Sequence, residues 1–267
     1  EASLSAGLLS KVLRRERELN DKHLEKLEPV LIKYGFEKLL NPTNVVSVVN
    51  INSGETKTTT VASLSKALSS LGFKVLMIDF DPKAKLSSHF GVYPTKINIY
   101  HALKGWSEPP VHYIKNNLYL IPSDIDLYAG LDEFTNLSSN FLLKKMVDSL
   151  RKEYDYIYID SGPGLGGLFM NTLIAADELI IPLSLAPLAL KGLSLLFQNL
   201  DTIQEQVNLS FTIKGILITK YDSCSSEHND HINTLKNNIP ILIFLMNLFN
   251  WTNTQKKQGP LKKITLS

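Results

Sequence analysis

Short runs of β-branched and aliphatic residues alternate, along most of the chain, with longer stretches whose apolar residues recur at helical spacing. The short runs predict strands at residues 45–49, 74–80, 118–121, 156–159, 178–183 and 214–219. The longer stretches predict helices at residues 58–71, 141–153, 170–176 and 191–207. Because strands that are apolar on both faces belong to parallel sheets buried between helices, we expect a doubly wound, mostly parallel sheet. The predicted fold class is therefore α/β.

The first 44 residues show a different pattern. Leucine and valine residues recur there at spacings of three and four and alternate with charged residues, which predicts an amphipathic helical arm broken near Pro29. Turn-forming residues at 41–44 precede the first predicted strand. We therefore place a helical N-terminal arm at 1–44 and the main domain at 45–267. The arm either docks on the domain or mediates dimerisation or partner binding, and the sequence does not decide between these roles.

The pattern becomes irregular again from about residue 237. An apolar stretch at 239–251 is followed by a basic tail at 256–263. The apolar stretch fits a last strand and helix of the core, which we favour, a peripheral membrane helix, or a sequence altered late in the chain. No segment reaches the roughly 18–20 uninterrupted apolar residues that a membrane-spanning helix requires.

Residues 49–60 connect the first predicted strand to the first predicted helix, with the sequence VNINSGETKTTT. At such a junction, backbone N–H groups bind anions, a lysine reaches the outer phosphates, and the next hydroxyl can bind Mg²⁺. Lys57 and Thr58 fit the last two roles. The predicted nucleotide-binding residues are Ser53, Gly54, Glu55, Thr56, Lys57, Thr58 and Thr59. Taken alone, this stretch fits a helix-capping turn equally well.

Three carboxylates lie at the carboxyl ends of predicted strands. Asp79 and Asp81 end the second strand, and Asp160 ends the fourth. Because the carboxyl ends of parallel strands meet at one edge of a sheet, we expect these side chains near the loop that follows the first strand. Carboxylates there can bind Mg²⁺ directly or through water and can orient an attacking water. The alternative for Asp81 is an ordinary Asp-Pro turn.

Charge and composition narrow the classes of function. The 28 basic and 26 acidic residues give a formal charge of +2, so any DNA contact must be a local patch rather than a property of the whole surface. A single cysteine, Cys224, excludes an internal disulfide and a multi-cysteine metal site, and it favours a reducing compartment. Hydrophobic residues make up 44% of the chain, which is enough to bury a core.

The loop and the carboxylates together resemble the motifs of ParA/MinD-type P-loop ATPases, and most closely those of ParA/Soj-like partition proteins. Residues 57–59 coincide with the end of the family's deviant Walker A loop. Asp79 and Asp81 coincide with its Asp-x-Asp-Pro motif, and Asp160 with its Walker B acid. The resemblance extends over residues 45–223 and implies a P-loop NTPase fold.

The resemblance also implies roles for these residues. Lys57 and Asp81 are expected to be catalytic, since Asp81 would orient the attacking water. Thr58, Asp79 and Asp160 are expected to support the metal ion. The implied cofactors are ATP or ADP and Mg²⁺.

Two residues of the loop depart from the family pattern. Asn52 stands where the family has its signature lysine, which reaches across the dimer to the partner's phosphates, and Ser53 replaces a glycine. Gly162, after the third acid, replaces a proline of the family's usual Asp-x-Pro-Pro. Because Asn52 cannot supply a positive charge, we expect slow ATP hydrolysis.

The cellular role is implied by the resemblance alone. It suggests a cytoplasmic, nucleoid-associated homodimer that binds DNA non-specifically when ATP is bound, acts with a ParB-like centromere-binding partner, and segregates a plasmid or chromosome. The alternatives are a hydrolysis-impaired nucleotide-binding scaffold and a MinD-like positioning protein.

Overall fold

A computed structural model describes residues 43–93, 96–129, 133–134, 138–207, 211–239 and 243–245. Its β-strands are β1 (Asn44–Val48), β2 (Val75–Phe80), β3 (His112–Lys115), β4 (Leu118–Ile121), β5 (Tyr156–Ser161), β6 (Glu178–Ser184), β7 (Thr212–Thr219) and β8 (Ile243–Leu245). They form one sheet in the order β3-β4-β2-β5-β1-β6-β7-β8. Every neighbouring pair is parallel except β3 with β4.

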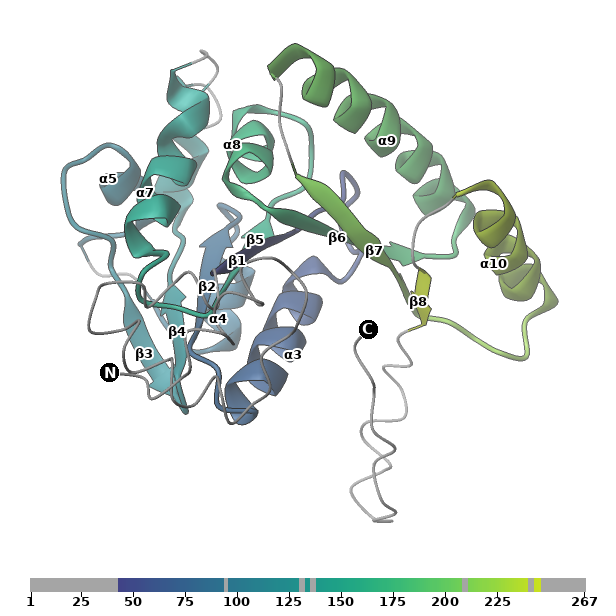
Figure 1. The fold of residues 1–267 in the computed structure, drawn as a ribbon, viewed down its shortest axis with the longest axis horizontal. Coiled ribbons are helices and arrows are strands. Elements are labelled where there is room, and N and C mark those ends of the chain that lie inside the picture. The colour runs from purple at the N-terminus through teal and green to yellow at the C-terminus, as the bar shows by residue number, and fades with distance from the viewer. Residues whose placement is uncertain are drawn as a thin grey trace, which may run out of the picture.

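The described α-helices are α3 (Lys57–Ser70), α4 (Lys85–His89), α5 (Ile99–Leu103), α7 (Leu142–Leu150), α8 (Gly167–Ala175), α9 (Pro187–Val207) and α10 (Ser226–Asn238). Two short 3-10 helices span Ile125–Tyr128 and Ser139–Phe141. Figure 1 shows helices on both faces of the sheet, with α3 and α4 on one side and α5 and α7 on the other. The structure thus confirms the predicted α/β fold with a mostly parallel sheet. In the part of the chain that is described, no helix combines the length and apolarity needed to cross a membrane.

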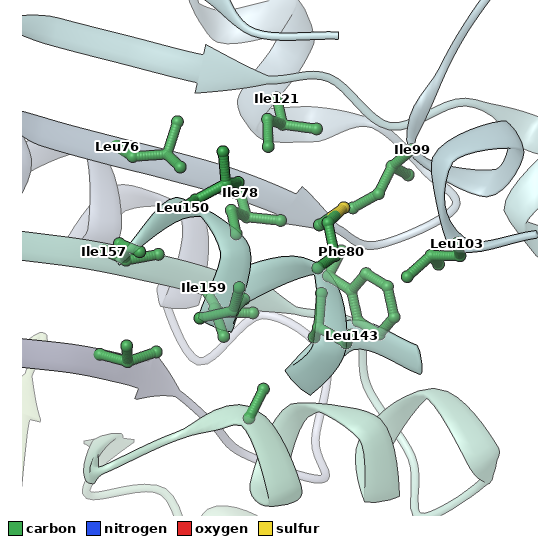
Figure 2. Packing of buried hydrophobic residues seen from close by; sticks show 14 of the residues in the cluster. Leu76, Ile78, Phe80, Ile99, Leu103, Ile121, Leu143, Leu150, Ile157 and Ile159 are labelled. Atoms are coloured by element: carbon green, nitrogen blue, oxygen red, sulfur yellow. The ribbon is translucent and has the colours of Figure 1, made fainter. Parts of the chain in front are cut away.

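The core lies on both faces of the central strands. On β2, Leu76, Ile78 and Phe80 pack against α5 and α7, as Figure 2 shows. Val75 and Met77 of the same strand pack with side chains of α3 and α4. All five side chains are fully buried. A strand covered on both faces favours apolar residues at each position, which explains the apolar run at 75–78 that precedes Asp79.

The strand order brings the expected functional residues to one edge of the sheet. Strand β5 lies between β2 and β1, and Asp160 pairs in register with Asp79 on one side and Val48 on the other. The loop that leaves β1 therefore meets the carboxylates that end β2 and β5. Parallel sheets of this kind bind their ligands at this edge.

All the predicted strands are present, with ends that differ by at most two residues from the prediction. Two helices begin three or more residues earlier than predicted, α8 at Gly167 and α9 at Pro187. Proline suits the first turn of a helix because the N–H groups of that turn have no partner within the helix. The predicted arm at 1–44 lies outside the described residues, apart from its last two, and so does the tail from residue 246.

Four elements have no counterpart among the predicted ones. Helices α4 and α5 and strand β3 are short, and α10 is rich in polar residues, so none of them gives a strong periodic signal. Strand β8 falls in the stretch for which a last core strand was favoured, and it pairs in parallel with β7.

Candidate functional site

Two residues with positive φ angles shape the loop between β1 and α3. Gly54 has a φ of 80° and Thr56 a φ of 60°. Glycine adopts this conformation freely, but a β-branched threonine does so only where the surrounding structure holds it there. Thr56 immediately precedes α3, and its hydroxyl is buried without a hydrogen-bond partner in the described chain. The loop is therefore strained at the residue where its helix begins.

Lys57 is buried inside this loop. Its ammonium group donates hydrogen bonds to the carbonyl oxygens of Asn50 and Asn52, both at 2.9 Å. Burial lowers the pKa of Lys57, and the carboxylates of Asp160 and Asp81 act in the opposite direction. The backbone of the loop thus fixes the ammonium group close to two acids.

Two contacts join the loop to the carboxyl end of β6. The side-chain amide of Asn50 donates to the carbonyl of Pro182 at 2.8 Å. The buried carboxylate of Glu55 accepts hydrogen bonds from the backbone N–H of Ser184 at 2.6 Å and from its hydroxyl at 3.1 Å. Glu55 was predicted only as a member of the nucleotide-binding loop. Its carboxylate attaches that loop to the sheet.

Other contacts come from segments at the same edge of the sheet. Lys220, the first residue after β7, donates from its ammonium group to the carbonyl of Gly54 at 2.9 Å. The N–H of Gly164, in the segment after β5, donates to the carbonyl of Ile51 at 3.1 Å. The sequence pattern does not reveal the first contact, because 166 residues separate Lys220 from Gly54.

Asn52 turns its side chain toward α9. Its amide nitrogen lies 3.5 Å from the carbonyl oxygen of Leu188. It also packs directly on Gly192, where an added Cβ would lie only 2.2 Å from the same nitrogen. A side chain at position 192 would therefore displace Asn52. The position at which the resemblance predicts a lysine thus holds a neutral amide.

The buried carboxylate of Asp79 accepts three hydrogen bonds. One oxygen accepts from the N–H and the hydroxyl of Ser87, at 2.8 and 2.7 Å, and the other from the N–H of Asp81 at 3.3 Å. Burial raises the pKa of Asp79 to about 6, although the hydrogen bonds from Ser87 oppose this shift. Asp79 thus holds the segment after β2 in place. Its role in metal binding stays a prediction.

Asp160 is equally buried, and no donor in the described chain makes a hydrogen bond of ordinary geometry to either carboxylate oxygen, although the Thr58 hydroxyl lies near enough to act on it. Burial raises the pKa of Asp160 well above its usual value, and the charge of Asp79 adds to this shift. Thr58 and Lys57 act in the opposite direction. A buried carboxylate without donors is costly unless a cation joins it. Its environment therefore fits a site for a positively charged ligand.

A cavity of about 260 Å³ opens where these elements meet. Its lining residues are Ser53, Gly54, Glu55, Thr56, Lys57, Thr58, Thr59, Asp81, Lys83, Lys85, Ser161 and Pro163. All the predicted nucleotide-binding residues and Asp81 are thus brought together, whereas Asp79 and Asp160 are not among the lining residues. Lys83, Lys85, Ser161 and Pro163 were not predicted. Lys83 directly follows the Asp-Pro pair and Lys85 begins α4, so the positive charge just after β2 was the signal available.

The residues present suit a nucleotide with Mg²⁺. Within the described ranges, no group of three or more histidine, cysteine, aspartate or glutamate side chains could hold a metal ion. Mg²⁺ in nucleotide sites needs no such group, because one or two protein ligands, phosphate oxygens and water complete its shell. Thr58 and the unpartnered Asp160 are the protein groups that would hold it.

Comparison with known proteins agrees with this geometry. A family model described as "AAA domain" matches residues 43–213. The chromosome-partitioning ATPase Soj of Treponema pallidum is 37% identical over 183 residues, which cover 66% of this chain and 70% of that protein.

Solved structures with bound nucleotide have a similar fold. Cobyrinic acid a,c-diamide synthase from Mycobacterium smegmatis, with bound ATP analogue and magnesium, matches with a TM-score of 0.70 and 30% identity, covering 74% of this chain and 84% of that one. The ATP complex of a McdA variant from Cyanothece matches with a TM-score of 0.72 and 25% identity, covering 77% and 83%. With the family model matched over more than half of the sequence, the chain belongs to the ParA/MinD-type P-loop ATPases.

Proposed function

We propose that this chain is a ParA-like nucleotide switch that binds ATP or ADP with Mg²⁺ and hydrolyses ATP slowly. The observation that carries the proposal is the cavity in which the loop before α3 faces Asp81, with the unpartnered Asp160 buried beside Lys57. A helix N-terminus, a lysine and carboxylates at adjoining strand ends are the groups that phosphoryl transfer requires.

In this proposal, each group has one task. Backbone N–H groups of residues 53–59 bind the phosphate oxygens, and Lys57 places its charge beside them. Asp81 lines the cavity and accepts a hydrogen bond from the attacking water, which orients it. Thr58 and Asp160 hold Mg²⁺, which offsets phosphate charge when it is bound.

Slow hydrolysis follows from position 52. Charge develops on the phosphates during transfer, and a preorganised cation stabilises it more in the transition state than in the ground state. Asn52 is neutral and its side chain faces α9. Nucleotide binding, which depends on the backbone of the loop, is expected to survive this substitution.

The cellular part of the proposal rests on the relatives. Soj of T. pallidum is a chromosome-partitioning ATPase. We extend this role to the chain as an ATP-dependent homodimer that binds DNA non-specifically and acts with a ParB-like partner in the cytoplasm. Because the net charge is only +2, DNA binding must depend on local lysine and arginine contacts and weaken steeply with salt. A hydrolysis-impaired scaffold is the alternative, and measured turnover separates the two.

A thermal-shift experiment tests the nucleotide site. Ligand that binds only the folded state stabilises it by about 2.7 kcal/mol at a hundredfold excess over Kd, so Mg²⁺-ATP should raise Tm by roughly 5–10 °C. Lys57→Ala should remove this shift. Lys115→Ala, which changes an exposed lysine at the far edge of the sheet, should keep it. A wild-type protein that shows no shift in millimolar Mg²⁺-ATP would refute the nucleotide site.

A further inference from the structure

Two lysines that have no part in the proposed mechanism line the same cavity. Lys83 lies between β2 and α4, and Lys85 is the first residue of α4; both line the wall that also contains Asp81. Lys83 also borders a second cavity of about 200 Å³, which shares Asp81 and Pro163 with the first. Lys83 therefore stands where the two spaces join.

The backbone of this segment is fixed at both ends. The carboxylate of Asp81 accepts the N–H of Lys83 at 3.0 Å, and the carbonyl of Asp81 accepts the N–H of Ala84 at 2.8 Å. Beyond the lysines, Ser87 donates two hydrogen bonds to the buried carboxylate of Asp79. Both lysines thus start from an ordered turn beside the cavity, although their side chains are exposed.

Neither ammonium group is neutralised by the residues that the structure describes. Among the described residues, no hydrogen bond or ion pair involves the side chain of Lys83 or of Lys85. Lys57, in contrast, is already engaged with carbonyl oxygens of its own loop. The two lysines are therefore the cations of the cavity that are free to meet an anion.

Their charges act at short range in the cavity. Burial lowers the pKa of Lys57, and the positive charge of Lys85 contributes to that shift. With Lys83 and Lys85 included, three lysines face the carboxylates of Glu55 and Asp81 in the lining. Without them, one lysine would face two carboxylates, an unfavourable balance for a polyphosphate.

We infer that Lys83 and Lys85 bind the terminal phosphate of a nucleoside triphosphate and set a preference for triphosphate over diphosphate. This inference rests on the proposed function, in which the loop holds the inner phosphates and Asp81 faces the outermost one. Both lysines belong to the short stretch after Asp81 and line the cavity with it, so they lie on the side of the terminal phosphate. Since they belong to the same chain as the loop, the preference needs no second copy and is independent of protein concentration.

The experiment compares the Kd of ADP with that of a non-hydrolysable ATP analogue, both with Mg²⁺, by calorimetry. Variants are Lys83→Gln, Lys85→Gln and the double variant, with Lys115→Gln as the matched control. Because an exposed ion pair contributes little, each substitution should weaken binding of the analogue up to about fivefold, and both together up to about 25-fold. The Kd of ADP should change less than about twofold. Lys83→Arg and Lys85→Arg, which keep the charge, should retain the wild-type preference for the ATP analogue over ADP.

The possible outcomes distinguish failure of this inference from failure of the proposed function. A double variant that binds the analogue and ADP with similar Kd, while the control keeps the wild-type ratio, supports the assignment. A double variant that keeps the wild-type ratio, or that loses both nucleotides equally, overturns it and leaves the nucleotide site standing. A wild-type protein that binds neither nucleotide refutes the proposed function itself and the inference with it.

Discussion

The cavity has one wall made by the loop before α3 and another made by strand ends. The loop wall depends on backbone groups, whereas the other wall depends on side chains. The loop offers backbone N–H groups, and contacts from Asn50, Glu55 and Lys220 to the rest of the sheet edge hold its shape. The strand ends offer the side-chain oxygens of Asp81, which lines the cavity, and of the buried Asp160, which lies outside the lining. A backbone donor survives a side-chain substitution, but a carboxylate does not. The departures predicted from the sequence lie in the loop, and the acids match the pattern that the chain resembles, as this difference would allow.

The carboxylates at the strand ends should tolerate substitution less well than the loop, and Asp160→Asn is the first test of this expectation. Loss of this carboxylate should lower single-turnover ATP hydrolysis by about a thousandfold, because one preorganised group of the transition state is removed. Without nucleotide, the same variant should be more stable than wild type, since a carboxylate whose burial is costly is gone. Hydrolysis at the wild-type rate would show that Asp160 has no part in the reaction.

The stability gain of Asp160→Asn should depend on pH. A carboxyl group whose pKa is raised by folding binds its proton more tightly in the folded state, so its contribution to stability falls as pH rises above the usual value of 3.8. The gain in Tm should therefore be largest at neutral pH and vanish in acid. Asp201→Asn, an exposed change on α9, is the control and should leave Tm nearly constant.

Asn52→Lys tests the loop wall and should produce the next largest effect. A lysine restored at this position should raise single-turnover hydrolysis by about a hundredfold and change nucleotide affinity by less than about fivefold. Asn52→Gln lengthens the side chain without adding charge and should leave the rate unchanged. If wild type already turns over as fast as Asn52→Lys, another group supplies this charge.

The smallest effect concerns the strain in the loop. Thr56→Gly should raise the free energy of unfolding by about 1 kcal/mol, because glycine adopts the positive φ without strain and the unpartnered hydroxyl is removed. Urea denaturation of the nucleotide-free protein measures it. Ala67→Gly, on the exposed face of α3, is the matched control and should lower the same quantity by about 1 kcal/mol. A loss for Thr56→Gly as large as the loss for the control would mean that the loop carries no strain there.

The sequence predicts what depends on local pattern. Strand β4 has the predicted ends, because a buried apolar run is bounded on both sides by polar or turn-forming residues. The seven loop residues and Asp81 come together as expected, since the carboxyl ends of parallel strands share one edge. Such a pattern does not show which residues, distant in the sequence, contact one another.

The tether from Lys220 and the missing partners of Asp160 therefore emerge only from the folded chain. The cavity role of Lys83 and Lys85 emerges in the same way, because an exposed lysine after a turn is usually solvated.

The contacts that hold the loop have a consequence for synthesis of the protein. Asn50, Gly54 and Glu55 emerge from the ribosome early, but their partners Pro182, Ser184 and Lys220 follow 129 to 166 residues later. A nascent chain therefore carries the loop without its supports until β6 and β7 have been made. Capture of ATP during translation would thus report that nearly the whole sheet has assembled, not merely that its first strand and helix exist.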